Sequence, residues 1–252
     1  MRRILVIGMG AGDPEHLTLQ AIKALNQVDV FFVLDKGPVK SDLVQLRKHI
    51  CERFIDTQDY RIVEIQDPVR DERIASYTER VAVWHEQRAK LIGQQFLSEL
   101  AEDACVGFLV WGDPALYDST LRILERVRTE VAFECEVIPG ISSVQTLAAR
   151  HRIALHDVGA PVHITTGRRL AEQRALPADS DVVVMLDGEQ AFKTLEDHAG
   201  LEIFWGAYLG TERELLVSGP LRERSAEIEA LRAQARAEHG WIMDTYLIRR
   251  QR

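Results

Sequence analysis

The segment Phe108–Thr120 (FLVWGDPALYDST) has the residue types of a small-molecule binding loop. Four apolar residues at 108–111 predict a buried strand, and a helical pattern begins again at Ser119. Between them, Gly112 allows a ligand to approach the backbone closely, and the carboxylate of Asp113 can accept hydrogen bonds from hydroxyl or amine groups. Ligands bind at the carboxyl ends of strands in open parallel sheets, so one interpretation of this segment is a ligand loop. The other is a plain turn, because Gly, Asp and Pro are common in turns.

Three further strand-like runs end in loops of similar character. The run at 4–7 precedes the glycine-rich loop 8–14 (GMGAGDP), the run at 29–34 precedes Asp35 and Lys36, and the run at 133–138 precedes PGISS at 139–143. On a doubly wound parallel sheet these loops would share one edge. The loop 8–14 does not match the dinucleotide fingerprint GxGxxG, because its third glycine comes one position early and Pro14 follows. It could also be an ordinary flexible connection.

Two predicted helices carry polar residues of uncertain role. The helix predicted at 74–100 places Trp84, His85 and Arg88 on adjoining turns, where they either border a pocket or pack on one another. The helix predicted at 225–238 is rich in Glu and Arg, so we expect a solvated face with Ile228 and Leu231 turned inward.

Composition limits the classes of partner. The chain has 252 residues, 46% of them hydrophobic, which is enough for a sizeable core. Its 31 basic and 39 acidic residues give a net charge of -8, so we expect no nucleic-acid partner. No apolar run reaches the roughly 18 residues that a membrane-spanning helix needs, so we expect no membrane partner. The three cysteines are widely spaced and form no CxxC, which favours a reducing cytoplasm.

The pattern of elements changes between residues 153 and 161, where a polar linker precedes shorter strands. We predict an N-terminal α/β domain at 1–158, which carries the GMGAGDP, GDPALY and PGISS loops, and a C-terminal α/β domain at 159–252. Strands predicted at 163–166, 182–186, 203–209, 215–217 and 242–249 have hairpin-like spacing, which favours a mixed second sheet.

The segments GMGAGDPEHLT, GDPALY, VIPGISS and VVVMLDG, in this order and spacing, resemble the tetrapyrrole (corrin/porphyrin) methyltransferases over nearly the whole chain. The resemblance implies the two-domain tetrapyrrole methylase fold, an α/β fold with a mostly parallel N-terminal sheet, a mixed C-terminal sheet and the ligand cleft between them. It also implies S-adenosyl-L-methionine as methyl donor, S-adenosyl-L-homocysteine as product, no metal, and a homodimer.

Matching positions imply the donor contacts. They are Ala11 in the first loop, Gly112, Asp113 and Leu116 in the second, Ser142 and Ser143 in the third, and Met185 or Leu186 with Gly210 in the second domain. Two residues depart from the family pattern. Ala11 stands where most relatives have proline, and Trp111 stands where many have a glycine, so we expect different pocket walls.

Within the family, the GDPALY and PGISS segments and the WHEQRA helix most resemble a member from aerobic cobalamin (vitamin B12) biosynthesis. The implied reaction methylates precorrin-5 at C-1 and releases the extruded acyl group as acetate, giving precorrin-6A. Acetate release needs a base and a polarising donor, for which Asp35, Lys36 and Tyr117 are candidates. Arg168, Arg169 and His85 are candidates for binding the tetrapyrrole substrate. Each of these side chains could instead be structural or simply solvated.

Other functions remain possible from the residues alone. Another precorrin methylase, a uroporphyrinogen methylase or diphthine synthase would share the donor loops. An RNA 2′-O-methyltransferase would also share them, but the acidic balance disfavours it. In a different class, a nucleotide-binding regulatory or redox protein would also have glycine loops, and the broken GxGxxG pattern counts against it.

Overall fold

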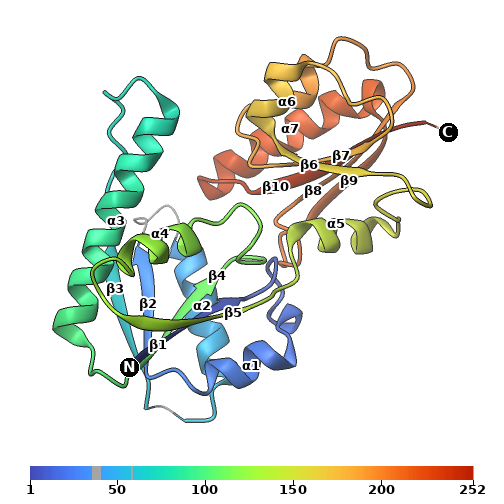
Figure 1. Ribbon diagram of the computed structural model, residues 1–252. Coiled ribbons are helices and arrows are strands. Elements are labelled where there is room, and N and C mark those ends of the chain that lie inside the picture. The colour runs from blue at the N-terminus through green and yellow to red at the C-terminus, as the bar shows by residue number, and fades with distance from the viewer. Residues whose placement is uncertain (36–40, 58, 252) are drawn as a thin grey trace. The chain divides into compact units, whose positions relative to one another are not determined.

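The computed structural model describes residues 1–35, 41–57 and 59–251, which form two units of strands and helices (Figure 1). By residue contacts, the first unit comprises residues 1–10 and 14–142, and the second comprises 11–13 and 143–252. The domain division predicted at residue 158 stays a prediction. In the described part of the chain, no helix has the length and apolar character needed to span a membrane.

The first unit is built on a sheet of five parallel strands in the order β3-β2-β4-β1-β5. The strands are β1 (Arg2–Gly8), β2 (Val30–Asp35), β3 (Arg61–Gln66), β4 (Cys105–Val110) and β5 (Phe133–Ile138). The helices between them are α1 (Leu19–Leu25), α2 (Ser41–Phe54), α3 (Tyr77–Glu99) and α4 (Thr120–Val127), with a short 3-10 turn, η1 (Pro14–His16).

Alternating side chains of β1 divide the core of this unit into two layers. Ile4 and Val6 pack with residues of α3 and α4, whereas Leu5 and Ile7 pack with residues of α1 and α2. The chain crosses the sheet from β1 to β3 and then returns to β5. Because crossover connections are nearly always right-handed, this reversal puts the later helices on the opposite face. Burial on both faces explains the continuous apolar runs of the sequence.

Strands β1 and β4 are neighbours whose connections leave in opposite directions. The chain passes from β1 over β4 to β2, and from β4 over β1 to β5. Such a reversal in strand order opens a crevice at the carboxyl ends of the two strands, where ligands bind in doubly wound sheets. The four loops singled out in the sequence all follow strands of this one parallel sheet, so the prediction that they share an edge is confirmed.

The second unit contains a mixed sheet, as predicted, in the order β6-β7-β10-β8-β9. Only the β6–β7 pair is parallel. The strands are β6 (Val162–Thr166), β7 (Asp181–Met185), β8 (Leu201–Ala207), β9 (Leu215–Pro220) and β10 (Asp244–Arg250). The helices are α5 (Ser143–His151), α6 (Gly167–Gln173) and α7 (Leu221–His239), with the 3-10 turn η3 (Ala191–Thr194).

Helix α7 corrects one expectation. Ile228 is buried and Leu231 packs against the core, as predicted, but Arg232 also turns inward. Its Nε lies 3.1 Å from Oδ2 of Asp244, and that oxygen also accepts a hydrogen bond of 2.9 Å from Nε1 of Trp205. A buried charge is costly unless it is paired, so removing either partner would leave the other stranded. The spacing of hydrophobic residues along the sequence cannot reveal a buried ion pair such as Arg232 and Asp244.

The aromatic layer under α3 gives a stability test. Phe96 is fully buried and its ring lies 5.4 Å from that of Phe32, 6.4 Å from that of Phe108 and 6.0 Å from that of Phe133. We expect Phe96→Ala to lower the free energy of unfolding by about 3–5 kcal/mol, because the lost contacts leave a cavity. The neighbouring Leu97 is 65% exposed, so Leu97→Ala serves as control with a change within about 0.5 kcal/mol. Urea denaturation followed by circular dichroism measures both, and equal midpoints would contradict the assigned core.

Candidate functional site

The loops after β1 and β4 are joined by backbone hydrogen bonds. The amide of Gly112 donates to the carbonyl of Gly10 at 2.8 Å, and the amide of Gly10 donates back at 3.4 Å. Both residues have positive φ, 84° for Gly10 and 68° for Gly112, a conformation that glycine adopts without steric cost. The two loops at the switch point are therefore held in fixed positions relative to each other.

A third loop, after β5, meets these two so closely that no side chain fits. A Cβ atom on Gly140 would lie 2.2 Å from the carbonyl oxygen of Gly112. A Cβ atom on Gly8 would lie 2.6 Å from the amide nitrogen of Gly140 and 2.9 Å from the carbonyl oxygen of Gly112. Three glycines that follow or end three different strands therefore meet in one contact. In the sequence they belong to three separate motifs.

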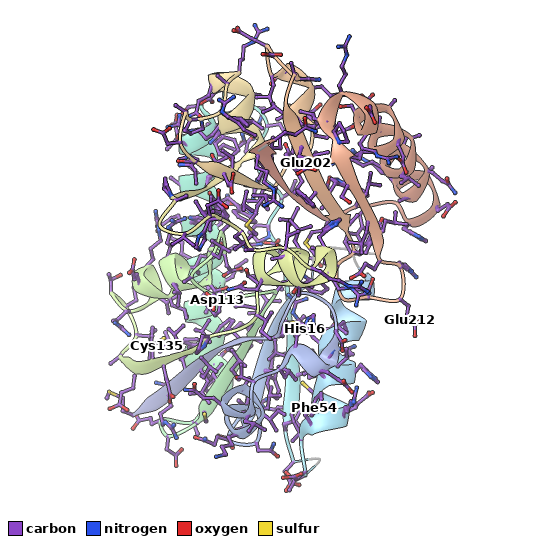
Figure 2. All side chains as sticks on the ribbon, turned by 90° about the vertical axis from the view of Figure 1, so that its right-hand side faces the viewer. His16, Phe54, Asp113, Cys135, Glu202 and Glu212 are labelled. Atoms are coloured by element: carbon purple, nitrogen blue, oxygen red, sulfur yellow. The ribbon has the colours of Figure 1, made fainter. Side chains whose placement is uncertain are left out.

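Asp113, which is labelled in Figure 2, connects two of these loops through its side chain. One carboxylate oxygen accepts a hydrogen bond from the amide of Ala115, and the other accepts one from the amide of Gly140, each at 2.8 Å. Charge-assisted hydrogen bonds of this kind are among the stronger ones in proteins. The predicted donor contact of Asp113 stays a prediction, and a carboxylate with two such bonds still has acceptor capacity for a ligand hydroxyl.

Tyr117 occupies an unusual position in the same loop. Its φ is 54°, in the left-handed region, and its side chain is 41% exposed. A bulky residue in this region costs about 1–3 kcal/mol, and such strain concentrates at ligand sites. Partial burial raises the pKa of the Tyr117 phenol, so the group keeps its proton at neutral pH and can donate a hydrogen bond. Leu116 is half-buried beside it.

The remaining predicted residues of the first unit lie at different depths. Ser142 is buried at the end of the loop after β5, and Cα of Ser142 lies 3.5 Å from the position of a Cβ on Gly112. Asp35 is the last residue of β2, at the same sheet edge. Lys36 lies outside the described residues. The loops therefore gather Gly112, Asp113, Leu116, Tyr117 and Ser142.

On α3, Trp84, His85 and Arg88 pack on one another, which is one of the two predicted alternatives, and the other, a pocket border, stays a prediction. Arg88 is buried and pairs with both carboxylate oxygens of Asp67, the contact from Nε measuring 2.6 Å. Its guanidinium lies 3.4 Å from the ring centroid of Trp84, whose Nε1 donates to the carbonyl of Pro68 at 2.7 Å. Arg88 also donates to Oγ of Ser119 at 3.4 Å, so this cluster contacts the end of the GDPALY loop.

His85 lies beside this cluster and is buried. Burial lowers its pKa, and four nearby arginines, at positions 88, 126, 122 and 70, lower it further. Because the pKa falls below the ordinary value of about 6.5, the imidazole is neutral at neutral pH. The neutral imidazole has one nitrogen that can accept a hydrogen bond, and the same burial and arginines that lower its pKa make it a weaker base than an ordinary histidine.

In the second unit, three strands end at one edge of the mixed sheet. β6 and β7 are parallel, and β8 has the same direction because both β7 and β8 are antiparallel to β10. Arg168 and Arg169 follow β6 in α6, Leu186 follows Met185 at the end of β7, and Gly210 follows β8. The predicted second-unit residues therefore share an edge.

Leu186 is the most conspicuous of these residues. It has a φ of 53° and is 62% exposed, an apolar side chain held out of the core at a strained position. The next residue, Asp187, is buried and fixes the turn. Its carboxylate accepts hydrogen bonds from the amides of Glu189 (3.0 Å) and Ala191 (2.6 Å) and from the hydroxyl of Tyr246 (2.6 Å). Sequence analysis missed this role of Asp187, although the LDG turn marked its place.

The other second-unit candidates have structural contacts of their own. The amide of Gly210 donates to Glu214 at 2.9 Å, and Oγ of Ser143 accepts from Thr245 at 2.9 Å. Ala11 is buried, and a Cβ on the next residue, Gly12, would lie 2.5 Å from the carbonyl oxygen of Leu209. Arg169 pairs with Glu172 on the surface at 3.0 Å. All predicted binding and catalytic roles stay predictions.

A cavity of about 450 Å³ lies at the opposite edge of the first sheet. It is lined by residues at the amino ends of β2, β3 and β4, among them Asp29, Arg61 and Ala104. Oδ2 of Asp29 accepts a hydrogen bond of 2.7 Å from the amide of Cys105 and so serves the sheet. Size alone does not make this cavity the site, because ligands of parallel sheets bind at the carboxyl ends of strands.

Comparison with known proteins decides the family. Residues 3–224 match the family described as Tetrapyrrole (Corrin/Porphyrin) Methylases. The chain belongs to this family. Among its relatives, a precorrin-6A synthase (deacetylating) from Sinorhizobium sp is 53% identical over 253 residues, which cover 99% of this chain and 96% of the relative. The resemblance inferred from the motifs is confirmed.

Solved structures of the family agree with the fold. A protein from Corynebacterium diphtheriae, described as cobalamin synthesis related (CobF), is 41% identical, covers 100% of both chains and has a TM-score of 0.84. A uroporphyrin-III C-methyltransferase from Thermus thermophilus is 19% identical, covers 98% of this chain and 93% of its own, and has a TM-score of 0.59. The tetrapyrrole methylase fold predicted from the sequence is therefore confirmed.

The glycine contact of this methylase gives a direct test. We expect Gly140→Ala to destabilise the protein by about 1–3 kcal/mol, because the added methyl overlaps backbone atoms that cannot move independently. Gly93→Ala in helix α3 is the matched control, since a Cβ there would meet only side-chain atoms of Val127 and Glu130, at 3.9 Å. That control should be neutral or stabilising by up to about 1 kcal/mol. Thermal melting compares them, and an unchanged melting temperature in Gly140→Ala would refute the close approach.

Proposed function

We propose that the chain transfers a methyl group from S-adenosyl-L-methionine to C-1 of precorrin-5 and releases the extruded acyl group as acetate. This is the reaction of a precorrin-6A synthase (deacetylating), the name of the relative that is 53% identical over nearly its whole length. The observation that carries the proposal is the meeting of three glycine loops at the switch point of the first sheet. The family match favours this function over a nucleotide-binding regulatory or redox protein.

The glycine loops fit a nucleoside-bearing donor. Gly112 is buried, but a Cβ there would meet only Ser142, at 3.5 Å, so the backbone at this position is not crowded. Tyr117 and Ile141, which are 41% and 36% exposed, offer apolar surface in the adjoining loops. When bound, the donor supplies a methyl group already activated by its sulfonium. The protein therefore needs to align the ring carbon with that methyl group and to exclude water, which is a matter of position. The contacts assigned to Ala11, Ser143, Met185, Leu186 and Gly210 belong to the same proposal.

Acetate release requires different groups from methyl transfer. The oxygen of a water molecule bonds to the acyl carbon, the bond from that carbon to the macrocycle breaks, and its electron pair stays with the ring. Tyr117 is protonated and can polarise the acyl oxygen, whereas neutral His85 can accept the proton of the water. Asp35, the last residue of β2, and Lys36 remain alternative candidates. Arg168 and Arg169 remain candidates for the ring carboxylates.

We also propose a homodimer in the cytoplasm, with no nucleic-acid partner and no metal. Cys51 and Cys105 are buried thiols and Cys135 is half-buried, so the described cysteines fit a reducing compartment. Multi-angle light scattering of the purified protein measures the oligomeric state.

Product analysis with Tyr117→Phe tests the assignment of the second step. The unaltered protein should convert precorrin-5 and S-adenosyl-L-methionine to a C-1-methylated product and equal amounts of acetate. In Tyr117→Phe, we expect acetate release to slow by roughly 100- to 1000-fold, the cost of losing one polarising donor. Methylation should be nearly unaffected, so mass spectrometry should detect a methylated, still acylated product.

Tyr60→Phe is the control, because Tyr60 lies just before β3 at the other edge of the sheet and packs on Phe31. Acetate release in step with methylation in Tyr117→Phe would remove Tyr117 from the mechanism. Failure of the unaltered protein to methylate precorrin-5 would overturn the proposed substrate.

A further inference from the structure

Two exposed arginines near His85 have no counter-charge among the side chains that the structure describes. Arg88 is paired with Asp67, and Arg126 lies 2.9 Å from Glu86, so both of these cations are balanced. Arg70, in the loop after β3, and Arg122, in the first turn of α4, are exposed. Among the described side chains, which exclude those of residues 35–45, 58, 99 and 252, neither arginine has a carboxylate at ion-pair distance. The surface between α3 and α4 therefore carries unbalanced positive charge.

Each of these two arginines is held by its surroundings. The guanidinium carbon of Arg70 lies 4.1 Å from the ring centroid of Trp84, and Trp84 is itself anchored to the carbonyl of Pro68. Such a cation–π contact orients a guanidinium while leaving its N–H groups available. Arg122 is fixed by its place on α4, whose neighbours Ile123 and Leu124 are buried in the core.

Arg122 lies in the first turn of α4, where the positive end of the helix dipole makes a second positive charge unfavourable. A helix amino terminus attracts anions, yet the first turn of α4 contains no acidic residue and does contain Arg122. Ser119, at the N-cap position, makes no capping hydrogen bond, and its hydroxyl accepts instead from Arg88. Helix dipole and guanidinium therefore act together on any anion that approaches this turn.

We propose that Arg70 and Arg122 form a carboxylate-binding subsite on the first unit, which takes ring carboxylates of the tetrapyrrole substrate. The inference rests on the proposed function, since that substrate carries several carboxylates around its ring. Guanidinium groups bind carboxylates with two parallel hydrogen bonds, which fixes orientation as well as position. The subsite follows the ends of β3 and β4, so it lies at the same sheet edge as the glycine loops.

In this placement, donor binding and carboxylate binding occupy different positions along the carboxyl edge of the first sheet. The glycine contact follows β1, β4 and β5, whereas the arginines follow β3 and sit in the first turn of the helix after β4. The Arg88–Ser119 hydrogen bond joins the two regions through the GDPALY loop. Substrate carboxylates bound at the arginines would hold the ring in register with a donor bound at the glycines.

The test compares Arg70→Gln/Arg122→Gln with Arg128→Gln. Arg128 is an exposed arginine at the other end of α4, with its guanidinium over Phe133 at the amino end of β5. Binding is measured by fluorescence titration with uroporphyrin, a porphyrin polycarboxylate, and by calorimetry with S-adenosyl-L-homocysteine. In the double variant we expect uroporphyrin affinity to fall by at least about tenfold, and S-adenosyl-L-homocysteine affinity to stay within about twofold.

Steady-state kinetics with precorrin-5 should show the same division. KM should rise with little change in kcat, because the lost contacts bind substrate and transition state alike. Arg128→Gln should match the unaltered protein in every measurement. If the double variant does not fold, Arg122→Gln alone provides the same comparison, since it leaves the Arg70 and Trp84 contact in place.

Unchanged uroporphyrin affinity in a folded variant would overturn the subsite. Loss of S-adenosyl-L-homocysteine affinity with uroporphyrin binding retained would assign the arginines to the donor and also overturn it. If the unaltered protein binds uroporphyrin through these arginines but does not convert precorrin-5, the proposed function fails and the subsite stands.

Discussion

The close approach of three backbone segments at Gly8, Gly112 and Gly140 is the constraint on which the first unit depends. The space between them is too small even for a methyl group. The Asp113 carboxylate also joins two of the segments by accepting a hydrogen bond from the amide of Gly140. Packing this tight leaves the loops after β1, β4 and β5 almost no independent freedom. Rigid loops lose little conformational entropy when a ligand binds, so a site built on them is preorganised.

Strain and charge are distributed unevenly within each of the two units. Tyr117 and Leu186 are held at positive φ with exposed side chains, although apolar residues ordinarily avoid both conditions. At Leu186, the buried residue Asp187 offsets the cost of the strained backbone, since its carboxylate fixes the turn through three hydrogen bonds. On α3, the Arg88–Asp67 pair similarly supports the exposed arginines without using their charge. Buried polar partners therefore stabilise the backbone and side chains next to these exposed groups.

Local sequence patterns predicted most elements because each pattern depends on near neighbours. Thr18, a residue type common at helix N-caps, caps α1 by accepting a hydrogen bond of 3.0 Å from the amide of Ala21. The ends of several strands were predicted from apolar runs that stop at glycine or proline. Helix α3 begins at Tyr77 and not at Ile74, because Ser76 provides the cap. Helix α6 was missed because Leu170 is the one large apolar side chain that its seven residues bury, which is too few to show a helical period.

Contacts between distant residues could not be predicted in this way. Nothing local links Asp113 to Gly140 or Arg70 to Trp84, and Arg232 has the composition of a solvated face although it is buried with Asp244. The family resemblance named candidate donor contacts, but it did not reveal that Asp113 ties two loops together. The role of each residue in the site therefore depends on pairs that only the fold brings into contact.

Hydrogen–deuterium exchange with and without S-adenosyl-L-homocysteine tests the central claim that the carboxyl edge of the first sheet binds the donor. Ligand binding should slow amide exchange in peptides that cover Gly112–Tyr117 and Pro139–Ser142. Peptides from Leu100–Ala104, beside the cavity of about 450 Å³ at the amino edge, should exchange at an unchanged rate. Protection at Leu100–Ala104 with none in the two loops would contradict the account.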